Sequence, residues 1–107
     1  IDDAVEALLL GGSHPALAGG VFNVGRGEGV TVRDAFFLIA ERAVRVTGRR
    51  SQVREVAWPA DADPIEFRNF VADVRRIGAA CGWAARVAFA DGIDRLLHHA
   101  ASAAAHD

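Results

Sequence analysis

The chain has 107 residues, of which 51% are hydrophobic and 24% are charged. This composition is typical of one small globular domain, or of a piece of a larger one, and it excludes a disordered chain. The formal net charge of -2 gives no basic surface, so we expect no nucleic-acid partner. A single cysteine, Cys81, excludes an internal disulfide and a cysteine-based zinc site. No apolar run approaches the roughly 20 residues that cross a bilayer, so we expect no membrane partner.

The first residues predict a helix over residues 3–10. Its apolar stripe consists of Val5, Leu8 and Leu9. Gly11 offers a left-handed end to this helix. The chain opens at Ile1 without a methionine and runs straight into the helical pattern, which suggests a chain cut from something longer. Residues 21–24, Val-Phe-Asn-Val, are β-branched and aromatic and are followed by glycine, so they predict a buried strand.

Residues 25–30, Gly-Arg-Gly-Glu-Gly-Val, predict a glycine-rich loop between a strand and a helix. Such a loop suggests the phosphate-binding turn of dinucleotide-binding proteins. Here, however, the spacing is G-x-G-x-G, and Val30 stands where the third glycine of that fingerprint belongs. Thr31 then begins the next helix with its own cap. A plain connecting loop is therefore favoured, and no cofactor-binding residue is assigned.

The clearest predicted element is a helix over residues 32–47, ended by Gly48. Its apolar face is expected to contain Val32, Phe36, Ile39, Ala40 and Ala43, with Leu38 off the pattern. Residues 51–58 alternate between apolar and polar side chains and predict a second strand. The order strand, helix, strand predicts an α/β fold with a right-handed βαβ unit between Val21 and Trp58.

A proline-broken acidic loop is predicted from Pro59 to Phe67. It carries Asp61, Asp63 and Glu66. Paired acids can perform acid–base catalysis, but a hydrated loop is the favoured interpretation, and no catalytic residue is assigned. Arg68 and Asn69 follow, and a guanidinium beside an amide can clamp a phosphate or a sugar hydroxyl. From composition alone, a surface arginine is favoured over a binding site.

The last third predicts a short extended piece at residues 70–72, a helix over 74–81 capped by Asp73 and closed by Gly82, and a final helix over 89–104. The apolar face of the final helix is expected to contain Phe89, Ile93, Leu96, Leu97 and Ala100. Cys81 is expected to be a buried thiol rather than a nucleophile.

The four histidines predict no metal site and no charge relay. His98 and His99 are neighbours, and neighbouring side chains on a helix project about 100° apart, so both cannot readily hold one ion. His14 lies in a loop and His106 in the C-terminal tail.

Five short motifs occur in a characteristic order. They are Asp2-Asp3-Ala4-Val5-Glu6-Ala7, Val21-Phe22-Asn23-Val24-Gly25-x-Gly27, Thr31-Val32-Arg33-Asp34, Val71-Ala72-Asp73-Val74 and Cys81-Gly82-Trp83. Together they resemble the C-terminal part of extended short-chain dehydrogenases/reductases, the NAD-dependent epimerase/dehydratase family that acts on nucleotide sugars. The resemblance covers nearly the whole chain.

The resemblance implies that the cofactor machinery lies outside this chain. The family binds NAD or NADP on an N-terminal Rossmann domain and transfers hydride and protons with a Tyr-x-x-x-Lys pair, whereas this chain has neither tyrosine nor lysine. We therefore expect residues 1–107 to form a single C-terminal substrate-binding region that binds no cofactor and is inactive alone. The complete enzyme is expected to be a cytoplasmic homodimer.

The resemblance also implies a place for the substrate. The family often contacts the diphosphate or nucleoside of the substrate through the loop that precedes the Ala-Asp helix. In this chain Phe67-Arg68-Asn69 occupies the place of the usual Gly-Asp, and Ala62 stands where arginine is common. Arg68 is the first expected contact with the nucleotide sugar and Asn69 the second. The alternative function is a free-standing, non-enzymatic α/β binding or regulatory module that uses residues 32–47 as a partner surface.

Overall fold

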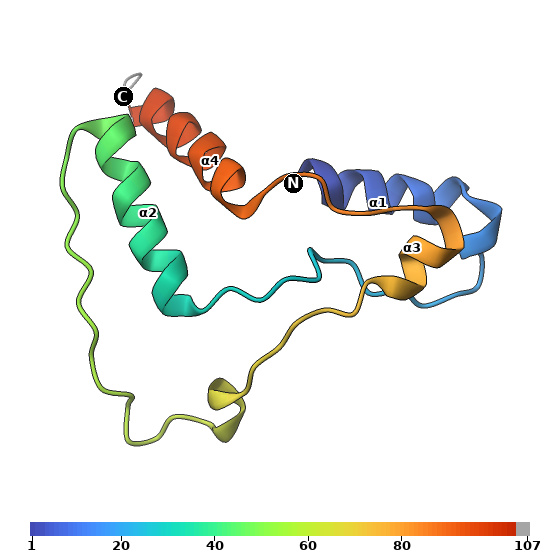
Figure 1. Cartoon of the computed structure of the whole chain (residues 1–107), viewed down its shortest axis with the longest axis horizontal. Coiled ribbons are helices and arrows are strands. Elements are labelled where there is room, and N and C mark those ends of the chain that lie inside the picture. The colour runs from blue at the N-terminus through green and yellow to red at the C-terminus, as the bar shows by residue number, and fades with distance from the viewer. Residues whose placement is uncertain (105–107) are drawn as a thin grey trace. The chain divides into compact units, whose positions relative to one another are not determined.

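The structure, a computed structural model, describes residues 1–104. Within them the chain forms four α-helices and two short 3₁₀ turns (Figure 1). In chain order these elements are α1 (Asp2–Ser13), η1 (Pro15–Leu17), α2 (Val32–Thr47), η2 (Pro64–Phe67), α3 (Arg75–Cys81) and α4 (Phe89–Ala104).

The predicted α/β fold is wrong, because residues 1–104 contain no β-strand and hence no βαβ unit. Residues 21–24 and 51–58, predicted as strands, belong to neither a helix nor a sheet. Alternating or β-branched residues favour an extended backbone. A strand, however, also needs a neighbouring strand that pairs with its N–H and C=O groups. The local sequence indicates a preference for extended backbone, but it does not indicate whether another strand is present to pair with it.

The chain divides into two compact units, and each is described separately. Unit 1 consists of residues 1–29 and 70–88, and it contains α1, η1 and α3. Unit 2 consists of residues 30–69 and the chain from residue 89 onward, and it contains α2, η2 and α4.

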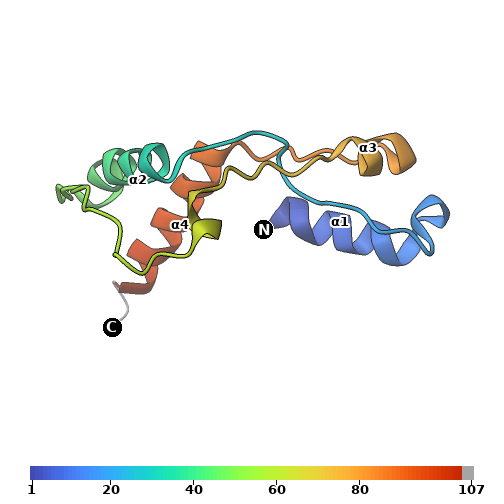
Figure 2. The same cartoon turned by 90° about the horizontal axis from the view of Figure 1, so that it is seen from below.

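Unit 1 is built around a very small core. Its buried side chains are Ala7, Leu17, Ile77 and Trp83. They come from α1, η1, α3 and the residue that follows Gly82, so one residue from each short element closes the core. Figures 1 and 2 both show the turn after α1 lying beside α3.

The apolar stripe predicted for the first helix does not face this core. Val5, Leu8 and Leu9 are all exposed, Leu8 to 76%. Ala7 is buried instead, and Leu10 packs against the core from one helical turn further on. Helix α1 therefore uses a narrow face with a small residue for packing and leaves its larger aliphatic side chains in water.

Helix α1 also runs past its predicted end, through Gly11 and Gly12 to Ser13. A glycine inside a helix costs only about 1 kcal/mol relative to alanine, so it does not stop a helix by itself. The helix ends where His14 precedes Pro15. A residue before proline is restricted to extended backbone, and His14 has φ -87° and ψ 119°.

Helix α3 begins at Arg75, one residue later than the predicted start at Val74. The predicted cap by Asp73 is wrong, because Val74 stands at the N-cap and makes no side-chain cap hydrogen bond. Asp73 lies one residue earlier, and its Oδ1 accepts a hydrogen bond from the Arg75 amide at 3.0 Å. The Arg75 guanidinium also donates to Asp73 Oδ2 at 2.6 Å. The guanidinium contact and then the amide lower the pKa of Asp73 from 3.8 to about 2. Gly82 ends the helix with φ 75°, as expected.

Asp3 joins α1 to the chain segment that follows Trp83. Its carboxylate accepts hydrogen bonds from the Val87 amide at 2.9 Å and the Arg86 amide at 3.1 Å. These two amides, Val87 first, lower the pKa of Asp3 below its ordinary value of 3.8. Glu6, one turn further along α1, forms an ion pair with the Arg86 guanidinium. The acidic side chains of α1 thus add polar contacts to the packing of Ala7 and Leu10 in unit 1.

Unit 1 is expected to lose stability as the pH falls from about 4 to about 2. Asp3 and Asp73 have lower pKa values in the folded chain than in the unfolded chain. Their charged forms therefore favour folding above pH 4, and this contribution disappears as both become protonated. Thermal unfolding followed by circular dichroism should show a falling midpoint across this range. In the Asp3→Asn/Asp73→Asn double variant, the midpoint should depend much less on pH. The control Asp61→Asn should keep the pH dependence of the parent chain. The same pH dependence in all three proteins would contradict the role given to Asp3 and Asp73.

Unit 2 contains the two long helices whose bounds the sequence predicts correctly. Helices α2 and α4 span residues 32–47 and 89–104. Thr31 Oγ1 accepts the Asp34 amide at 3.0 Å, and Gly48 ends α2 in the left-handed conformation with φ 69°. Capping groups next to an amphipathic segment are local signals, which is why both ends of α2 are predictable.

Helices α2 and α4 pack together in unit 2, and both views show them side by side (Figures 1 and 2). Arg42 Nη1 donates to Asp94 Oδ2 at 2.7 Å across this contact, with both side chains largely shielded from water. The predicted apolar face of α2 is only partly correct, because Val32 and Phe36 are exposed to 73% and 56%. Leu38, off the predicted pattern, is half-buried. In α4 the prediction fails at Leu96, which is 61% exposed, and at Ala100, which is also exposed.

Candidate functional site

The loop of residues 58–69, which contains both predicted substrate contacts, is closed by two aromatic rings. The ring centroids of Trp58 and Phe67 lie 4.9 Å apart, with an interplanar angle of 54°. Between them, the Ala62 amide donates to the Pro59 carbonyl at 3.1 Å and forms a tight turn. Figure 1 shows this part of unit 2 as the green-to-yellow segment that bends and leads into η2. The loop is therefore an ordered structure rather than an open connection.

The second half of the loop is organised by Asp63. Its Oδ1 accepts the Ile65 amide at 2.9 Å, and its carbonyl accepts the Glu66 amide at 2.9 Å. Pro64 at the first position of η2 suits this turn because its φ is already fixed. Residues 59–67 were predicted to be an irregular loop, and this is wrong for residues 64–67, which form η2.

Arg68 and Asn69 leave this turn at the surface, where the sequence places them. The Arg68 amide donates to the Ile65 carbonyl at 3.4 Å, and the Arg68 backbone is extended, with φ -84° and ψ 146°. Both side chains are exposed. Within the described residues the Arg68 guanidinium takes part in no ion pair, so its donors face solvent. They are available to a ligand that offers oxygen acceptors.

Trp58 and Phe67 form an aromatic pair that is not among the residues predicted for the site. Trp58 and Phe67 are 59% and 58% exposed, so much of each ring remains uncovered. The only sequence signal for a contact between these rings is an aromatic residue at each end of a proline-containing loop. Their contact depends on the turns between them, which alternation and capping rules do not predict.

The loop has more negative than positive groups. Asp61, Asp63 and Glu66 supply carboxylates, whereas Arg68 supplies the guanidinium. The Asp63 carboxylate already accepts a hydrogen bond from the Ile65 amide. All three acidic side chains are exposed, which agrees with the hydrated loop favoured above.

The glycine-rich loop has a packing role in unit 1. A Cβ atom added at Gly25 would lie 2.9 Å from the Ala72 Cβ, and one at Gly27 would lie 3.0 Å from Val74 Cγ2. At Gly29 the corresponding distance to Val71 Cγ2 is 3.1 Å. The alternate glycines thus allow residues 25–29 to approach residues 71–74 closely. The G-x-G-x-G spacing is explained without a phosphate ligand.

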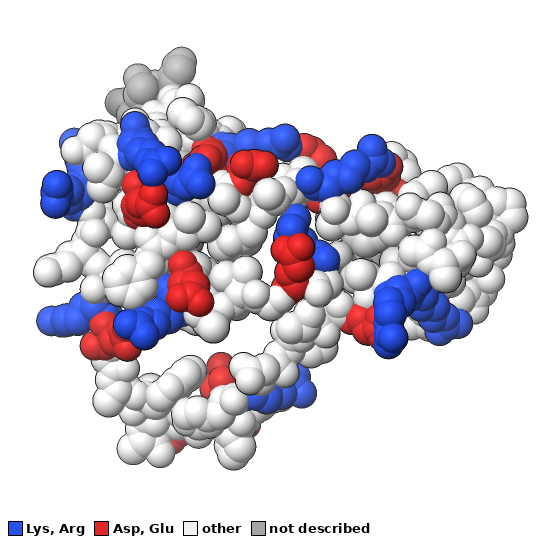
Figure 3. All heavy atoms as spheres, viewed as in Figure 1, with Lys and Arg blue, Asp and Glu red and all other residues white. Residues whose placement is uncertain are grey.

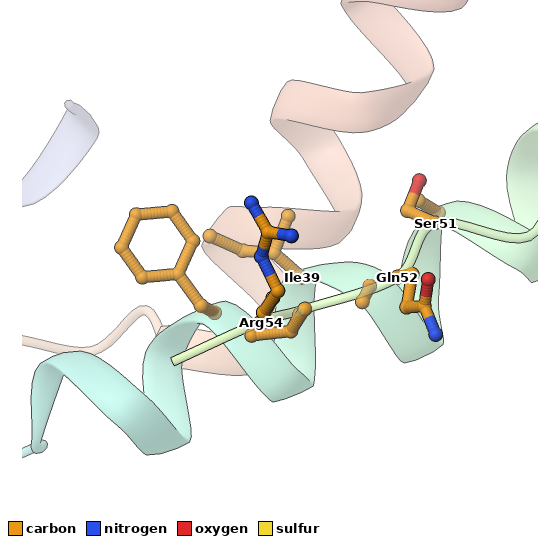
Figure 4. A pocket seen from close by; sticks show the side chains of 8 residues that line it. Ile39, Ser51, Gln52 and Arg54 are labelled. Atoms are coloured by element: carbon orange, nitrogen blue, oxygen red, sulfur yellow. The ribbon is translucent and has the colours of Figure 1, made fainter. Parts of the chain in front are cut away.

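A second candidate is the pocket of about 380 Å³ between α2 and the extended segment after it in unit 2. Its residues are Phe36, Ile39, Ala40, Ala43, Ser51, Gln52, Val53 and Arg54. Figure 4 shows Ile39 on the helix and Ser51, Gln52 and Arg54 on the extended segment. The helix contributes only apolar side chains and the segment contributes the polar ones. This arrangement suits packing or a mostly apolar ligand, and it brings no titratable pair together for catalysis.

No group of three or more His, Cys, Asp or Glu side chains in residues 1–104 could hold a metal ion. His98 and His99 are exposed on α4. In the loop after α1, His14 Nδ1 accepts the Ala16 amide at 3.3 Å. The remaining histidine, His106, lies outside the described residues.

Cys81 is half-buried at the edge of the core of unit 1. Its thiol donates to the Ile77 carbonyl at 3.4 Å, within α3. The predicted burial of this thiol is therefore only partial.

Arginine and carboxylate side chains are interspersed over the face shown in Figure 3. None of the helices in the described part of the chain combines the length and apolarity that a membrane span requires. Comparisons with protein-family models, with curated proteins and with solved structures found no match to this chain.

Proposed function

We propose that this chain is the substrate-binding C-terminal region of an NAD-dependent nucleotide-sugar epimerase or dehydratase. In this proposal NAD or NADP binds to a Rossmann domain that precedes these residues, in a cytoplasmic enzyme. The chain contributes the loop of residues 58–69, in which Arg68 and Asn69 contact the nucleotide sugar. Such a region contributes to the rate without a catalytic side chain, because it orients the sugar for reaction.

The proposal is supported mainly by the large apolar surface that the chain exposes to solvent. The chain exposes 8620 Å². Two separate globular proteins, each of half its 11.3 kDa mass, would together expose only about 6,900 Å². Large apolar side chains contribute to this exposed area, such as the stripe of Val5, Leu8 and Leu9 on α1 and Phe36 of α2. Large apolar side chains exposed on each unit are what we expect of a region that further polypeptide completes.

Replacing Arg68 with alanine in the complete enzyme is expected to raise KM for the nucleotide sugar about tenfold. The substitution removes a charge-assisted hydrogen bond to the substrate and leaves the reacting groups in place, so kcat should change little. Steady-state kinetics on the chain joined to the polypeptide encoded upstream of it would measure both constants. Arg49→Ala is a matched control, because Arg49 is another exposed arginine of unit 2.

Unchanged kinetics in Arg68→Ala would remove Arg68 from the site. A joined protein that neither binds NAD nor converts any nucleotide sugar would reject the enzyme assignment. That result would favour the free-standing binding or regulatory module, for which the exposed aromatic residues of α2 are the candidate surface.

A further inference from the structure

We infer that the pocket between α2 and residues 51–54 of unit 2 binds a small carboxylate with an aliphatic chain, such as a medium-chain fatty acid. The pocket has a volume of about 380 Å³, which lies within the range of small-molecule sites. It belongs to unit 2 alone and shares no residue with the loop of residues 58–69. The inference therefore does not depend on the proposed function.

Helix α2 supplies the apolar wall of the pocket. The side chains of this wall recur at the spacing that places residues on one face of a helix, and they are Phe36, Ile39, Ala40 and Ala43. Val53 adds an apolar side chain from the extended segment. Phe36 is 56% exposed, and the other four residues are only half-buried. An aliphatic chain that covers this wall removes apolar surface from water on both sides of the contact, which favours binding.

Arg54 supplies a positive charge on the opposite side of the same pocket. Figure 4 shows its guanidinium and the Ser51 hydroxyl pointing to one side of the extended segment, and the Gln52 amide pointing to the other. Within residues 1–104, Arg54 takes part in no ion pair. The pocket lining that the structure describes includes neither aspartate nor glutamate. An anionic group on the ligand would therefore be the counter-charge that Arg54 lacks.

The residue after Arg54 holds the extended segment beside α2. Glu55 Oε1 and Arg33 Nε form an ion pair at 2.8 Å, and Arg33 lies in the first turn of α2. This contact keeps Arg54 next to the helix that carries the apolar wall. It also engages the neighbouring carboxylate with a different arginine, so Glu55 does not serve as the partner of Arg54.

A carboxylate suits this lining better than a phosphate or a neutral group. The planar guanidinium matches the two oxygens of one carboxylate, and the Ser51 hydroxyl can donate a further hydrogen bond. A phosphate group carries up to about two negative charges and three acceptor oxygens, whereas the described lining offers one cation. A neutral chain would cover the apolar wall but would leave the guanidinium without a counter-charge.

The test is titration of the ¹⁵N-labelled chain with octanoate, 1-octanol and octylammonium, followed by the amide chemical shifts of residues 51–54. These probes have the same chain length and differ in the charge of the head group. Octanoate should bind with a dissociation constant of about 0.1–10 mM, as expected for a small ligand in an open pocket. The neutral 1-octanol should bind more weakly, and octylammonium should bind most weakly because its charge is repelled by Arg54.

Two variants separate the contribution of charge from that of the apolar wall. Arg54→Gln should weaken octanoate binding about fivefold, as expected for an exposed ion pair, and should leave 1-octanol binding unchanged. Arg49→Gln is its control, because Arg49 is an exposed arginine outside the pocket. Phe36→Ala should weaken the binding of octanoate and 1-octanol alike. Its control is Phe37→Ala, because Phe37 is also exposed on α2 and does not line this pocket.

Any of three results in the isolated chain would overturn the inference. They are no shift of residues 51–54 with octanoate up to about 10 mM, equal binding of octanoate and octylammonium, or unchanged octanoate binding in Arg54→Gln. Circular dichroism would verify that each variant retains its helices.

The same titration of the chain joined to the polypeptide encoded upstream distinguishes a ligand site from a surface that this polypeptide covers. Octanoate should bind to the joined protein as it does to the isolated chain. Loss of binding there would overturn the inference and assign the apolar wall of α2 to contact with the upstream polypeptide. Turnover of a nucleotide sugar tests the proposed function separately, so either proposal can fail while the other stands.

Discussion

Replacing Ile77 with alanine is expected to unfold unit 1. The Ile77 side chain is 2% exposed and belongs to a core with three other buried residues. Truncation of a buried isoleucine costs about 2–5 kcal/mol, through lost burial and the cavity that remains. Whole domains are stable by only about 5–15 kcal/mol, and a unit with so small a core lies at the low end of that range. Urea titration followed by the fluorescence of the buried Trp83 should show the transition move to a much lower concentration, or disappear.

Leu9→Ala is the matched control for Ile77→Ala. It also shortens an aliphatic side chain in a helix of unit 1, but Leu9 is 68% exposed. Its urea midpoint should stay close to that of the parent chain, because alanine favours helices and little burial is lost. If both variants unfold at the same urea concentration, α3 is not the centre of the unit 1 core.

Replacing Gly27 with alanine is expected to destabilise unit 1 for two reasons. The backbone at Gly27 has φ 73°, a conformation that costs an L-residue about 1–2 kcal/mol. The added Cβ would also lie 3.0 Å from Val74 Cγ2, so residues 25–29 and 71–74 would have to move apart. Thermal unfolding followed by circular dichroism should show a clearly lower midpoint.

Gly19→Ala separates the two effects at Gly27. Gly19 has a similar φ of 68°, but an added Cβ there would meet nothing within 4 Å. It should therefore show only the backbone effect and a smaller loss of stability than Gly27→Ala. Equal losses would mean that residues 25–29 are not packed against residues 71–74, and the phosphate-binding interpretation of the glycine-rich loop would need to be reconsidered.

The candidate site was predictable in part. Arg68 and Asn69 follow from sequence order and resemblance, and their exposure follows from their position after a proline-containing acidic loop. The Trp58–Phe67 contact was not predictable, because it requires the turn at Pro59 and the cap at Asp63 to form together. Each turn is a local feature, but bringing the two rings together depends on the combined geometry of both.

The amino-acid sequence by itself determined the long helices. The bounds of α2 and α4 follow from an amphipathic period and, in α2, from Thr31 and Gly48. These signals act within a few residues of the helix ends, so they need no tertiary contact. The β-branched and aromatic side chains of residues 21–24 and the alternation in residues 51–58 likewise indicated extended backbone rather than helix.

Only the tertiary structure decided which surfaces are buried and whether extended segments pair. Helix α1 has a conspicuous aliphatic stripe, yet it packs through Ala7, because Asp3 is held by the amides of Arg86 and Val87. Residues 51–58 alternate like a strand, yet no strand pairs with them in the described chain. Burial of a side chain and pairing of a strand both depend on which other element of the chain is its neighbour in the tertiary structure. A sequence pattern does not indicate which element that is.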